Sequence, residues 1–407
     1  MNILFLSENF PPETNAAATR VFERAVYWAK WGHAVTVITS APNFPHGKLF
    51  EGYKNRWKQT EDMNGIRVLR VKTYISANRG VVRRSLDFLS FFVTGTLAGL
   101  AEERPDVVAA TSPQFFAAVA GWSIGALRRI PFVFELGDLW PTSIAAVGAM
   151  KKGTALQVME KVELFLYRRS ARVAALTHAF KRNLISRGIP APKVAVVLNG
   201  VDLPRYAPRA RDAALAEEWG LNGKFVIGYV GTHGMAHGLM NVLDAAEILR
   251  PMEDVRFLFA GAGAERDMLM CAAKARGLGN VVFMPAQPKE AMPAVWSLCD
   301  VALVHLRDLP AFAEVIPSKI FEAMAMGLPI LLAAPKGEAA DIVEGHAAGR
   351  WVAPEAPEEL AGAVRSLAED REGREALSAA ALAAAPAHSR ETQAQEMLAV
   401  LEVAKAS

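Results

Sequence analysis

Short apolar runs alternate with longer amphipathic stretches along the whole chain. In the first half each run is rich in Val, Ile and Phe and is bounded by turn residues, which is typical of a buried β-strand. The stretches between the runs, such as 17–31, 85–101 and 115–127, place apolar residues at helical spacing. This alternation predicts a parallel sheet with helices on both faces. The predicted strands of this half are 3–6, 34–39, 66–71, 107–110, 132–135, 173–176 and 194–198.

A second series of strand-like runs begins after Lys224. A chain of 407 residues exceeds one ordinary core, so we predict two doubly wound α/β domains, 1–203 and 204–387. The segment 200–222 contains prolines and several charges and is predicted to be the linker. The alanine-rich tail from Pro357 onward is predicted to be helical, with one interruption at Pro386. The strands predicted in this half are 225–230, 255–260, 281–284, 301–304, 330–332 and 349–352.

Glycine-rich turns follow two strands of the second series. Gly231-Thr232-His233-Gly234 comes after 225–230, and Gly261-Ala262-Gly263 comes after 255–260. In open parallel sheets, ligands collect beyond the carboxyl ends of the strands. We therefore expect both turns to lie at a binding site.

A predicted helix further along the chain begins with a lysine. Pro317 and Ser318 precede it, and proline is tolerated where a helix starts. The free N–H groups and the dipole of a helix start attract phosphate, and Lys319 adds a full positive charge. Glu322 lies one turn further and can accept hydrogen bonds from ribose hydroxyls, and Glu314 precedes it by eight residues. Taken alone, this spacing is more often produced by two solvated carboxylates of an acidic helix.

Together with Asn199-Gly200-Val201-Asp202, these elements resemble glycosyltransferase family 4. The resemblance is strongest to the bacterial branch that builds O-antigen, colanic acid and similar surface polysaccharides, and it extends over nearly the whole chain. It implies the GT-B fold, in which two Rossmann-like domains face a central cleft and a last helix, here 388–407, crosses back onto the first domain. It also implies a retaining transfer from a nucleoside diphosphate sugar, for which we favour UDP over GDP. No cofactor and no metal are expected.

The same resemblance assigns roles to the residues of the second half. Lys319 is expected to neutralise the leaving diphosphate, Glu322 to act beside it, and Glu314 to hold hydroxyls of the donor sugar. The residues expected to bind the donor are Gly231, Thr232, His233, Gly234, His237, Gly261, Gly263, Pro317 and Ser318.

Two histidines stand where many members of the family carry an Arg and a Lys. His233 and His237 can donate hydrogen bonds, but near neutral pH a histidine is only partly charged. Lys319 is then the main fixed cation, and activity is expected to fall as the pH rises through the histidine range. Two histidines four residues apart without a third ligand do not predict a metal site.

Loops of the first half are expected to form the acceptor side of the site. The family usually has glycines after its first strand, whereas this chain has none there, so Arg20 is either a substitute cation or an ordinary exposed residue. Asp138 resembles a family aspartate and is a catalytic candidate, although capping the short turn before Pro141 would explain it equally well. The candidates for the acceptor-side loop are Asn15, Ala16, Arg20 and Ser112.

Charge divides unevenly between the two halves. Residues 1–204 contain 26 Lys and Arg against 15 Asp and Glu, a net charge of +11, while the remainder has 19 against 27, a net charge of −8. A basic half can face nucleic acid or an anionic membrane, and no nucleic-acid-binding motif accompanies these charges. We favour the membrane, with solvated surface charge as the alternative. The apolar stretch 86–101 is too short to span a bilayer and is either a core helix or an interfacial helix.

These features together predict an enzyme of the cytoplasm, attached peripherally to the inner face of the membrane. Cys271 and Cys299 lie outside any metal-binding spacing, and the N-terminus lacks the basic region of a signal peptide. The expected acceptor is a lipid-linked saccharide. The alternatives are a sugar-nucleotide epimerase of the same fold and a non-catalytic scaffold protein. A nicotinamide dehydrogenase is disfavoured because Gly261-Ala262-Gly263 lacks the third glycine of its fingerprint.

Overall fold

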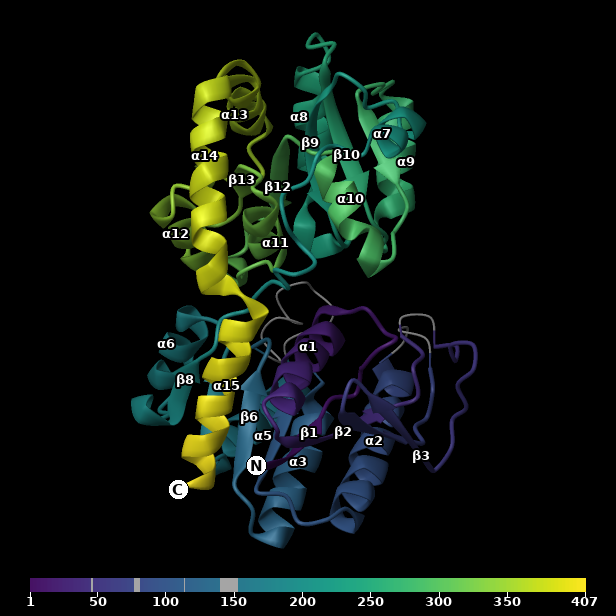
Figure 1. Cartoon of the computed structure of the whole chain (residues 1–407), viewed down its shortest axis with the longest axis vertical. Helices are drawn as coiled ribbons and strands as arrows, with labels where there is room; N and C mark the ends of the chain where they lie inside the picture. Colours follow the sequence, from purple (N-terminus) through teal and green to yellow (C-terminus); the bar gives the residue numbers. More distant parts are fainter. Residues whose placement is uncertain (45–46, 77–80, 113, 140–152) are drawn as a thin grey trace. The chain divides into compact units, whose positions relative to one another are not determined.

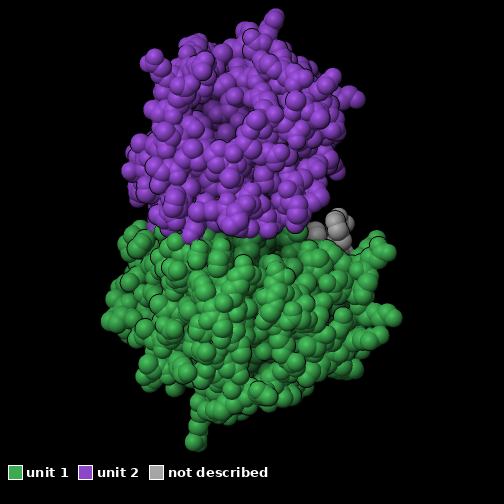
Figure 2. All heavy atoms as spheres, in the orientation of Figure 1, with its two compact units in different colours: residues 1–199, 390–407 green, residues 200–389 purple. Residues whose placement is uncertain are grey.

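The computed structural model describes residues 1–44, 47–76, 81–112, 114–139 and 153–407. Within these ranges the chain forms two units, coloured separately in Figure 2. Unit 1 comprises residues 1–199 and 390–407, and unit 2 comprises residues 200–389. Each unit has its own sheet, and each is an α/β layered structure. The predicted fold class, two Rossmann-like doubly wound domains, is confirmed.

Unit 1 contains an eight-stranded sheet in the order β3-β4-β2-β1-β5-β6-β7-β8. All neighbouring strands are parallel except β3 and β4, which are antiparallel. The sequence prediction missed β3 because its residues are mostly polar and only half-buried at the edge of the sheet. The strands are β1 (Asn2–Leu6), β2 (Ala34–Ser40), β3 (Lys58–Met63), β4 (Ile66–Val71), β5 (Val107–Thr111), β6 (Phe132–Leu136), β7 (Arg172–Ala175) and β8 (Val194–Val196).

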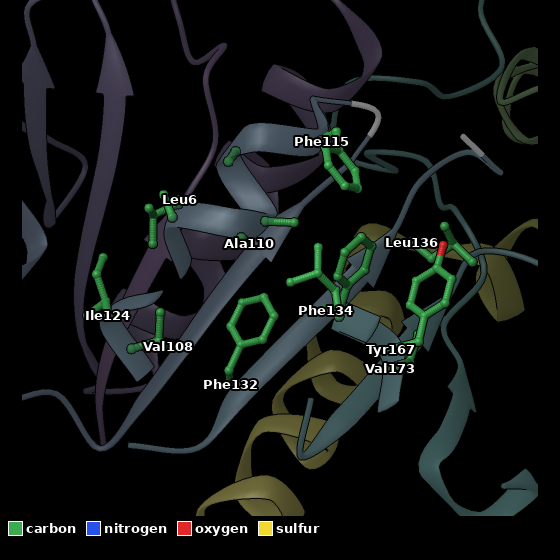
Figure 3. Packing of buried hydrophobic residues seen from close by; sticks show 14 of the residues in the cluster. Leu6, Val108, Ala110, Phe115, Ile124, Phe132, Phe134, Leu136, Tyr167 and Val173 are labelled. Atoms are coloured by element: carbon green, nitrogen blue, oxygen red, sulfur yellow. The ribbon is translucent and has the colours of Figure 1, made fainter. Parts of the chain in front are cut away.

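Helices cover both faces of this sheet (Figure 1). On one face lie α1 (Ala16–Lys30) and α15 (Arg390–Lys405), where Trp28 Nε1 donates a hydrogen bond of 2.9 Å to the carbonyl oxygen of Ala394. On the other face lie α2 (Val81–Ala101), α3 (Phe115–Arg128), α5 (Thr154–Arg169) and α6 (His178–Ser186). Figure 3 shows this second core, in which Phe134 makes an edge contact with Tyr167. The last helix therefore belongs to unit 1, although the residues just before it in the sequence belong to unit 2.

Unit 2 contains a six-stranded parallel sheet in the order β11-β10-β9-β12-β13-β14. The strand order reverses at β9, whose neighbours are β10 on one side and β12 on the other, so this is the point where ligands bind in such sheets. The helices α8 (Leu239–Ile248), α9 (Arg266–Ala275) and α13 (Pro357–Glu369) cover one face. The strands are β9 (Phe225–Val230), β10 (Val255–Ala260), β11 (Val281–Met284), β12 (Val301–His305), β13 (Ile330–Ala333) and β14 (Gly349–Val352).

The predicted linker is in fact a packed part of unit 2. It contains α7 (Ala213–Glu218), whose start is capped by Asp212, and it buries Tyr206 and Leu221. Arg211 also pairs with Asp300 at 2.6 Å. The linker prediction was wrong because the few apolar residues of this segment are widely spaced among charges and prolines.

The tail forms three helices where one interruption was predicted. After α13, Asp370 accepts a hydrogen bond from the N–H of Gly373 at 2.8 Å and caps α14 (Arg371–Ala384). The 3-10 turn η5 (Ala385–His388), which contains Pro386, separates α14 from α15. The break at Asp370 was missed because the residues on both sides of it favour helix. No helix in the described parts of the chain is long and apolar enough to cross a membrane.

Candidate donor site and family

Two backbone loops meet at the carboxyl ends of β9 and β10. The N–H of Gly231 donates to the carbonyl oxygen of Ala260 at 2.9 Å, and the N–H of His233 donates to that of Ala262 at 2.9 Å. A Cβ atom at Gly261 would overlap the carbonyl oxygen of Gly231, and one at Gly263 would overlap the backbone of His233. Only glycine permits this close approach. The structure thus brings the two predicted glycine turns into direct contact.

Lys319 reaches this loop from a third element. It is the first residue of α11 (Lys319–Met326), and Ser318 occupies the N-cap position without making a side-chain cap. A Cβ atom at Gly231 would lie 3.0 Å from the Nζ atom of Lys319. The Nζ atom is buried, and among the described residues it has no hydrogen-bond partner. Burial lowers the pKa of Lys319 to about 7, against the opposing effect of the Glu322 charge.

The carboxylate of Glu322 lies in the first turn of α11 and is half-buried. Its Oε2 atom accepts a hydrogen bond of 3.1 Å from Nε1 of Trp296. Trp296 lies in α10 (Met292–Ser297), a short helix that packs on α11. Trp296 is fully buried, so this bond fixes the carboxylate in one direction. Sequence reasoning missed Trp296, because it stands in an apolar stretch, 292–299, that predicts burial and gives no signal of a contact with Glu322.

Glu314 lies on a separate element from Glu322. It ends the 3-10 turn η4 (Pro310–Glu314) and is half-buried, as are Pro317 and Ser318. A Cβ atom at Gly337, which precedes α12 (Glu338–Gly345), would overlap the backbone of Ala313, so the turn is held against the start of that helix. The stretch from Glu314 to Glu322 is therefore a turn followed by a helix, with the Pro317-Ser318 step between them.

The histidines of the site are buried and neutral. The ring of His233 is fully buried against Tyr229, Phe259 and Phe283, and burial lowers its pKa to about 4. Burial also lowers the pKa of His237 to about 3. The expectation that these residues are partly charged near neutral pH was wrong, so a fall of activity in that pH range could not come from their titration. The reason is that His233 is fully buried and His237 is half-buried, so that both rings are shielded from water.

A third histidine, His305, which the sequence prediction missed, makes two reciprocal hydrogen bonds with His237. His305 ends β12 and is fully buried. Its Nδ1 atom lies 2.6 Å from the carbonyl oxygen of His237, while Nδ1 of His237 lies 3.3 Å from the carbonyl oxygen of His305. The side-chain amide of Asn241 lies 2.9 Å from Nε2 of His305. Both histidines thus donate from Nδ1 as neutral rings, and burial lowers the pKa of His305 to about 4.

The remaining donor-side candidates are backbone positions. The carbonyl oxygen of Thr232 accepts a hydrogen bond of 2.7 Å from the hydroxyl of Tyr229. Gly234 precedes the 3-10 turn η2 (Met235–His237), and its carbonyl oxygen accepts from the N–H of His237 at 2.9 Å. Their N–H groups, like those at the start of α11, are the groups that can face an anion.

The acceptor-side candidates of unit 1 have structural partners. Asn15 caps α1, accepting a hydrogen bond of 3.0 Å from the N–H of Ala18, and Ala16 is the first, exposed residue of that helix. The Oγ atom of Ser112 accepts from the N–H of Gly137 at 2.9 Å. Asp138 is half-buried after β6, and Pro141, the residue of its alternative capping role, lies outside the described residues.

Arg20 is neither exposed nor a free cation. Its Nε atom pairs with Oε1 of Glu135 at 3.0 Å, and its Nη2 atom donates to Oγ1 of Thr111 at 3.0 Å. Arg24 contacts the same carboxylate oxygen at 2.7 Å. The two guanidinium groups overcome the effect of burial and lower the pKa of Glu135 to about 2. Both readings of Arg20 from the sequence, exposure and service as a substitute cation, are corrected by this buried ion pair.

Two further carboxyl groups lie near the end of β1, and sequence reasoning did not single them out. Burial, followed by the charge of Asp87, raises the pKa of Glu8 well above its usual value. Burial also raises the pKa of Asp87, on α2, to about 7. Glu13 fixes the same loop by accepting hydrogen bonds from the N–H groups of Asn43 and Phe44, both at 2.8 Å.

Comparison with known protein families gives one consistent result over both units. Residues 15–200 match the family described as Glycosyl transferase 4-like domain, and residues 213–383 match Glycosyl transferases group 1. A relative named as the colanic acid biosynthesis glycosyl transferase WcaI of Escherichia coli (strain K12) is 28% identical over 338 residues, which are 80% of this chain and 82% of that protein. The GDP-mannose-dependent alpha-mannosyltransferase of Mycobacterium tuberculosis (strain CDC 1551 / Oshkosh) is 28% identical over 352 residues, 86% and 83% of the two chains.

Solved structures agree on the fold. Anabaena Alr3699/HepE, determined in complex with UDP, aligns with a TM-score of 0.73 at 21% identity over 99% of this chain and all of that one. WaaG, a glycosyltransferase involved in lipopolysaccharide biosynthesis, aligns with a TM-score of 0.69 at 14% identity over 98% and 99% of the two chains. The two α/β units, the glycine loops beside Lys319 and these similarities lead to one assignment: the chain is a glycosyltransferase of family 4 with the GT-B fold.

Proposed function

We propose that unit 2 holds a nucleoside diphosphate sugar and that the enzyme transfers its sugar, a hexose or acetamido sugar, with retention and without a metal ion. UDP is favoured over GDP as the leaving nucleotide. The observation that carries this proposal is the buried ammonium group of Lys319, placed beside the glycine loop at the switch point of the sheet. An uncompensated cation among free N–H groups suits a diphosphate better than any neutral ligand.

The chain's own groups can stabilise the leaving group. In the transfer, the bond from the anomeric carbon to the diphosphate oxygen breaks while the bond to the acceptor oxygen forms. Negative charge grows on the diphosphate, where Lys319 and the N–H groups beside Gly231 and Ser318 can neutralise it. The proton of the acceptor hydroxyl passes to the departing diphosphate, so no separate base is needed. Glu322, held by Trp296, and Glu314 are the proposed contacts to donor hydroxyls, and Asp138 is the catalytic candidate from unit 1.

The proposal is tested by transfer from labelled UDP- and GDP-sugars in the presence of EDTA, with NMR assignment of the anomer formed. We expect transfer from a UDP-sugar, an unchanged anomeric configuration, and loss of activity in Glu322→Ala. Glu372→Ala is the matched control, because Glu372 also lies in the first turn of a helix in unit 2 but is exposed. Inversion, a strict metal requirement, or turnover without any acceptor would contradict the proposal.

We further propose that α2 docks this enzyme on the inner face of the cytoplasmic membrane. The helix exposes an apolar stripe: Leu86, Leu89, Val93 and Leu97 are 46%, 45%, 46% and 61% exposed. Arg83 and Arg84 are exposed at the start of the same helix. Apolar residues beside arginines are the features that bind an anionic bilayer. A lipid-linked saccharide acceptor in surface polysaccharide synthesis would fit this location, and the relative WcaI is named for colanic acid biosynthesis.

Vesicle co-sedimentation tests the docking surface. Binding is expected to rise with the fraction of anionic lipid and to fall in the double variant Arg83→Glu with Arg84→Glu. Arg371→Glu is the control, since this arginine is 82% exposed but lies on unit 2. Binding that is independent of anionic lipid, or unchanged in the double variant, would contradict docking through α2.

A further inference from the structure

The ammonium group of Lys319 rests on an aromatic ring. The Nζ atom lies 3.8 Å from the centre of the Tyr229 ring, a distance well inside the range of cation–π attraction. Tyr229 is the last residue but one of β9 and is 1% exposed. Its hydroxyl is already used, donating to the carbonyl oxygen of Thr232. The same side chain therefore touches the cation on its face and the glycine loop at its tip.

The kind of partner matters for a cation that must bind phosphate. A carboxylate within hydrogen-bond distance would occupy the N–H groups of Lys319 and would oppose an incoming diphosphate. A ring face attracts the positive charge but accepts no conventional hydrogen bond, so all three N–H donors stay available. In the described structure the Nζ atom has no hydrogen-bond partner, which is the arrangement that this argument requires.

The Tyr229 ring packs against three further rings. His233 and His237 contact Tyr229 with ring centroids 5.9 Å apart in each case, and Phe259 lies on it at 6.1 Å. Burial lowers the pKa of His237 to about 3, so its neutral ring adds no second positive charge beside Lys319. Among the described residues, Lys319 is the cation whose Nζ atom lies over the ring at the centre of this group.

We propose that Tyr229 is a positioning residue, which holds the Lys319 ammonium over the glycine loop through its ring face and keeps it available to the donor diphosphate. The proposal rests on the proposed function for its ligand. The contact between the Tyr229 ring and the Lys319 ammonium group does not depend on that function, because it follows from the distance between them. It predicts that the electron density of the ring, and not only its shape, affects the donor site.

Two variants with rings of nearly equal shape separate these contributions. Tyr229→Phe removes the hydroxyl and keeps the ring face, whereas Tyr229→trifluorophenylalanine also withdraws charge from that face. The first readout needs no ligand: with ¹³C-labelled lysine, NMR follows the pKa of Lys319, identified by its loss in Lys319→Met. The second readout is calorimetric binding of UDP and GDP at pH 7. Melting temperatures verify that both variants are folded.

Relative to Tyr229→Phe, the fluorinated variant should lower the pKa of Lys319 by about 0.4 to 1.5 and weaken UDP binding by about 2- to 30-fold, the range that a cation–π contact supports. In the Lys319→Met background the two ring variants should bind UDP equally. The inference is overturned if fluorination leaves the pKa of Lys319 unchanged, or if it weakens binding as much without the lysine as with it. If the pKa responds while neither nucleotide binds even the unaltered protein, the pairing holds and the proposed function fails.

Discussion

Replacing Lys319 by methionine should change how the stability of unit 2 depends on pH. The pKa of this lysine is lowered from 10.5 to about 7 by burial. Between these two values the unfolded chain binds more protons than the folded chain, so the stability of the unaltered protein rises with pH there. The cost of burying the charge is fully present below pH 7 and is relieved as the pH approaches 10. Methionine has a similar length and tolerates an aromatic neighbour, so it removes the charge with little loss of packing.

The linkage relation sets the size of the effect. For one group with these two pKa values, the unaltered protein gains about 2 to 3 kcal/mol of unfolding free energy between pH 6 and pH 9, and the methionine variant gains none from this site. The variant should therefore be more stable at pH 6, and its advantage should shrink by that amount at pH 9. Other titrating groups are common to both proteins and cancel in the comparison.

Urea unfolding followed by circular dichroism measures this difference. The chain has two units, so the relevant transition is the one that the substitution moves. A difference between the two proteins that stays constant from pH 6 to pH 9 would mean that Lys319 titrates with an ordinary pKa. The picture of a buried, uncompensated cation would then be wrong, and with it the reason for placing a diphosphate there.

Further substitutions test the packing around both units. Gly261→Ala should cost about 3 kcal/mol of stability and abolish nucleotide binding because its Cβ overlaps the neighbouring loop, whereas Gly279→Ala, with open space around it, should be neutral in the same melting assay. Glu135→Gln should destabilise unit 1 by about 3–5 kcal/mol by leaving two buried arginines short of a counter-charge, against less than about 1 kcal/mol for the half-exposed Glu160→Gln; equal effects in urea unfolding would refute this. Trp296→Phe should weaken calorimetric nucleotide-sugar binding about tenfold by freeing the carboxylate that it holds, and unchanged binding would show that this contact is only structural.

Much of the fold follows from local patterns in the sequence. Strands that are buried on both faces appear as short apolar runs, so their positions, such as 225–230 and 255–260, agree with β9 and β10. The edge strand β3 and the helix α7 lack such a signal, because they bury few side chains and depend on contacts with distant segments. A pattern that reflects burial cannot reveal elements that are mostly exposed.

The glycine turns of the site and its lysine could be predicted from the sequence, but the partners of its side chains could not. Only glycine permits two backbones to approach so closely, so the presence of Gly261 and Gly263 in the sequence already indicates the contact between the two loops. The partners of Lys319 and Glu322 come instead from other elements, since Tyr229 lies in β9 and Trp296 lies in α10. Arg20 shows the converse case, in which a charged residue that looks like a ligand contact is satisfied by a buried carboxylate 115 positions away. Such pairings depend on three-dimensional neighbours that sequence spacing does not specify.

The central claim, that unit 2 binds a nucleoside diphosphate through α11, is tested most directly by thermal stabilisation. UDP, GDP, dTDP, ADP and CMP are compared without metal on the unaltered protein and on Glu322→Ala. A nucleotide at 100 times its dissociation constant adds about 2.7 kcal/mol to stability, which is readily seen as a melting shift. The account predicts that UDP raises the melting temperature of the unaltered protein and fails to do so in the variant. A panel in which no nucleoside diphosphate shifts the unaltered protein, or in which the variant responds equally, would contradict it.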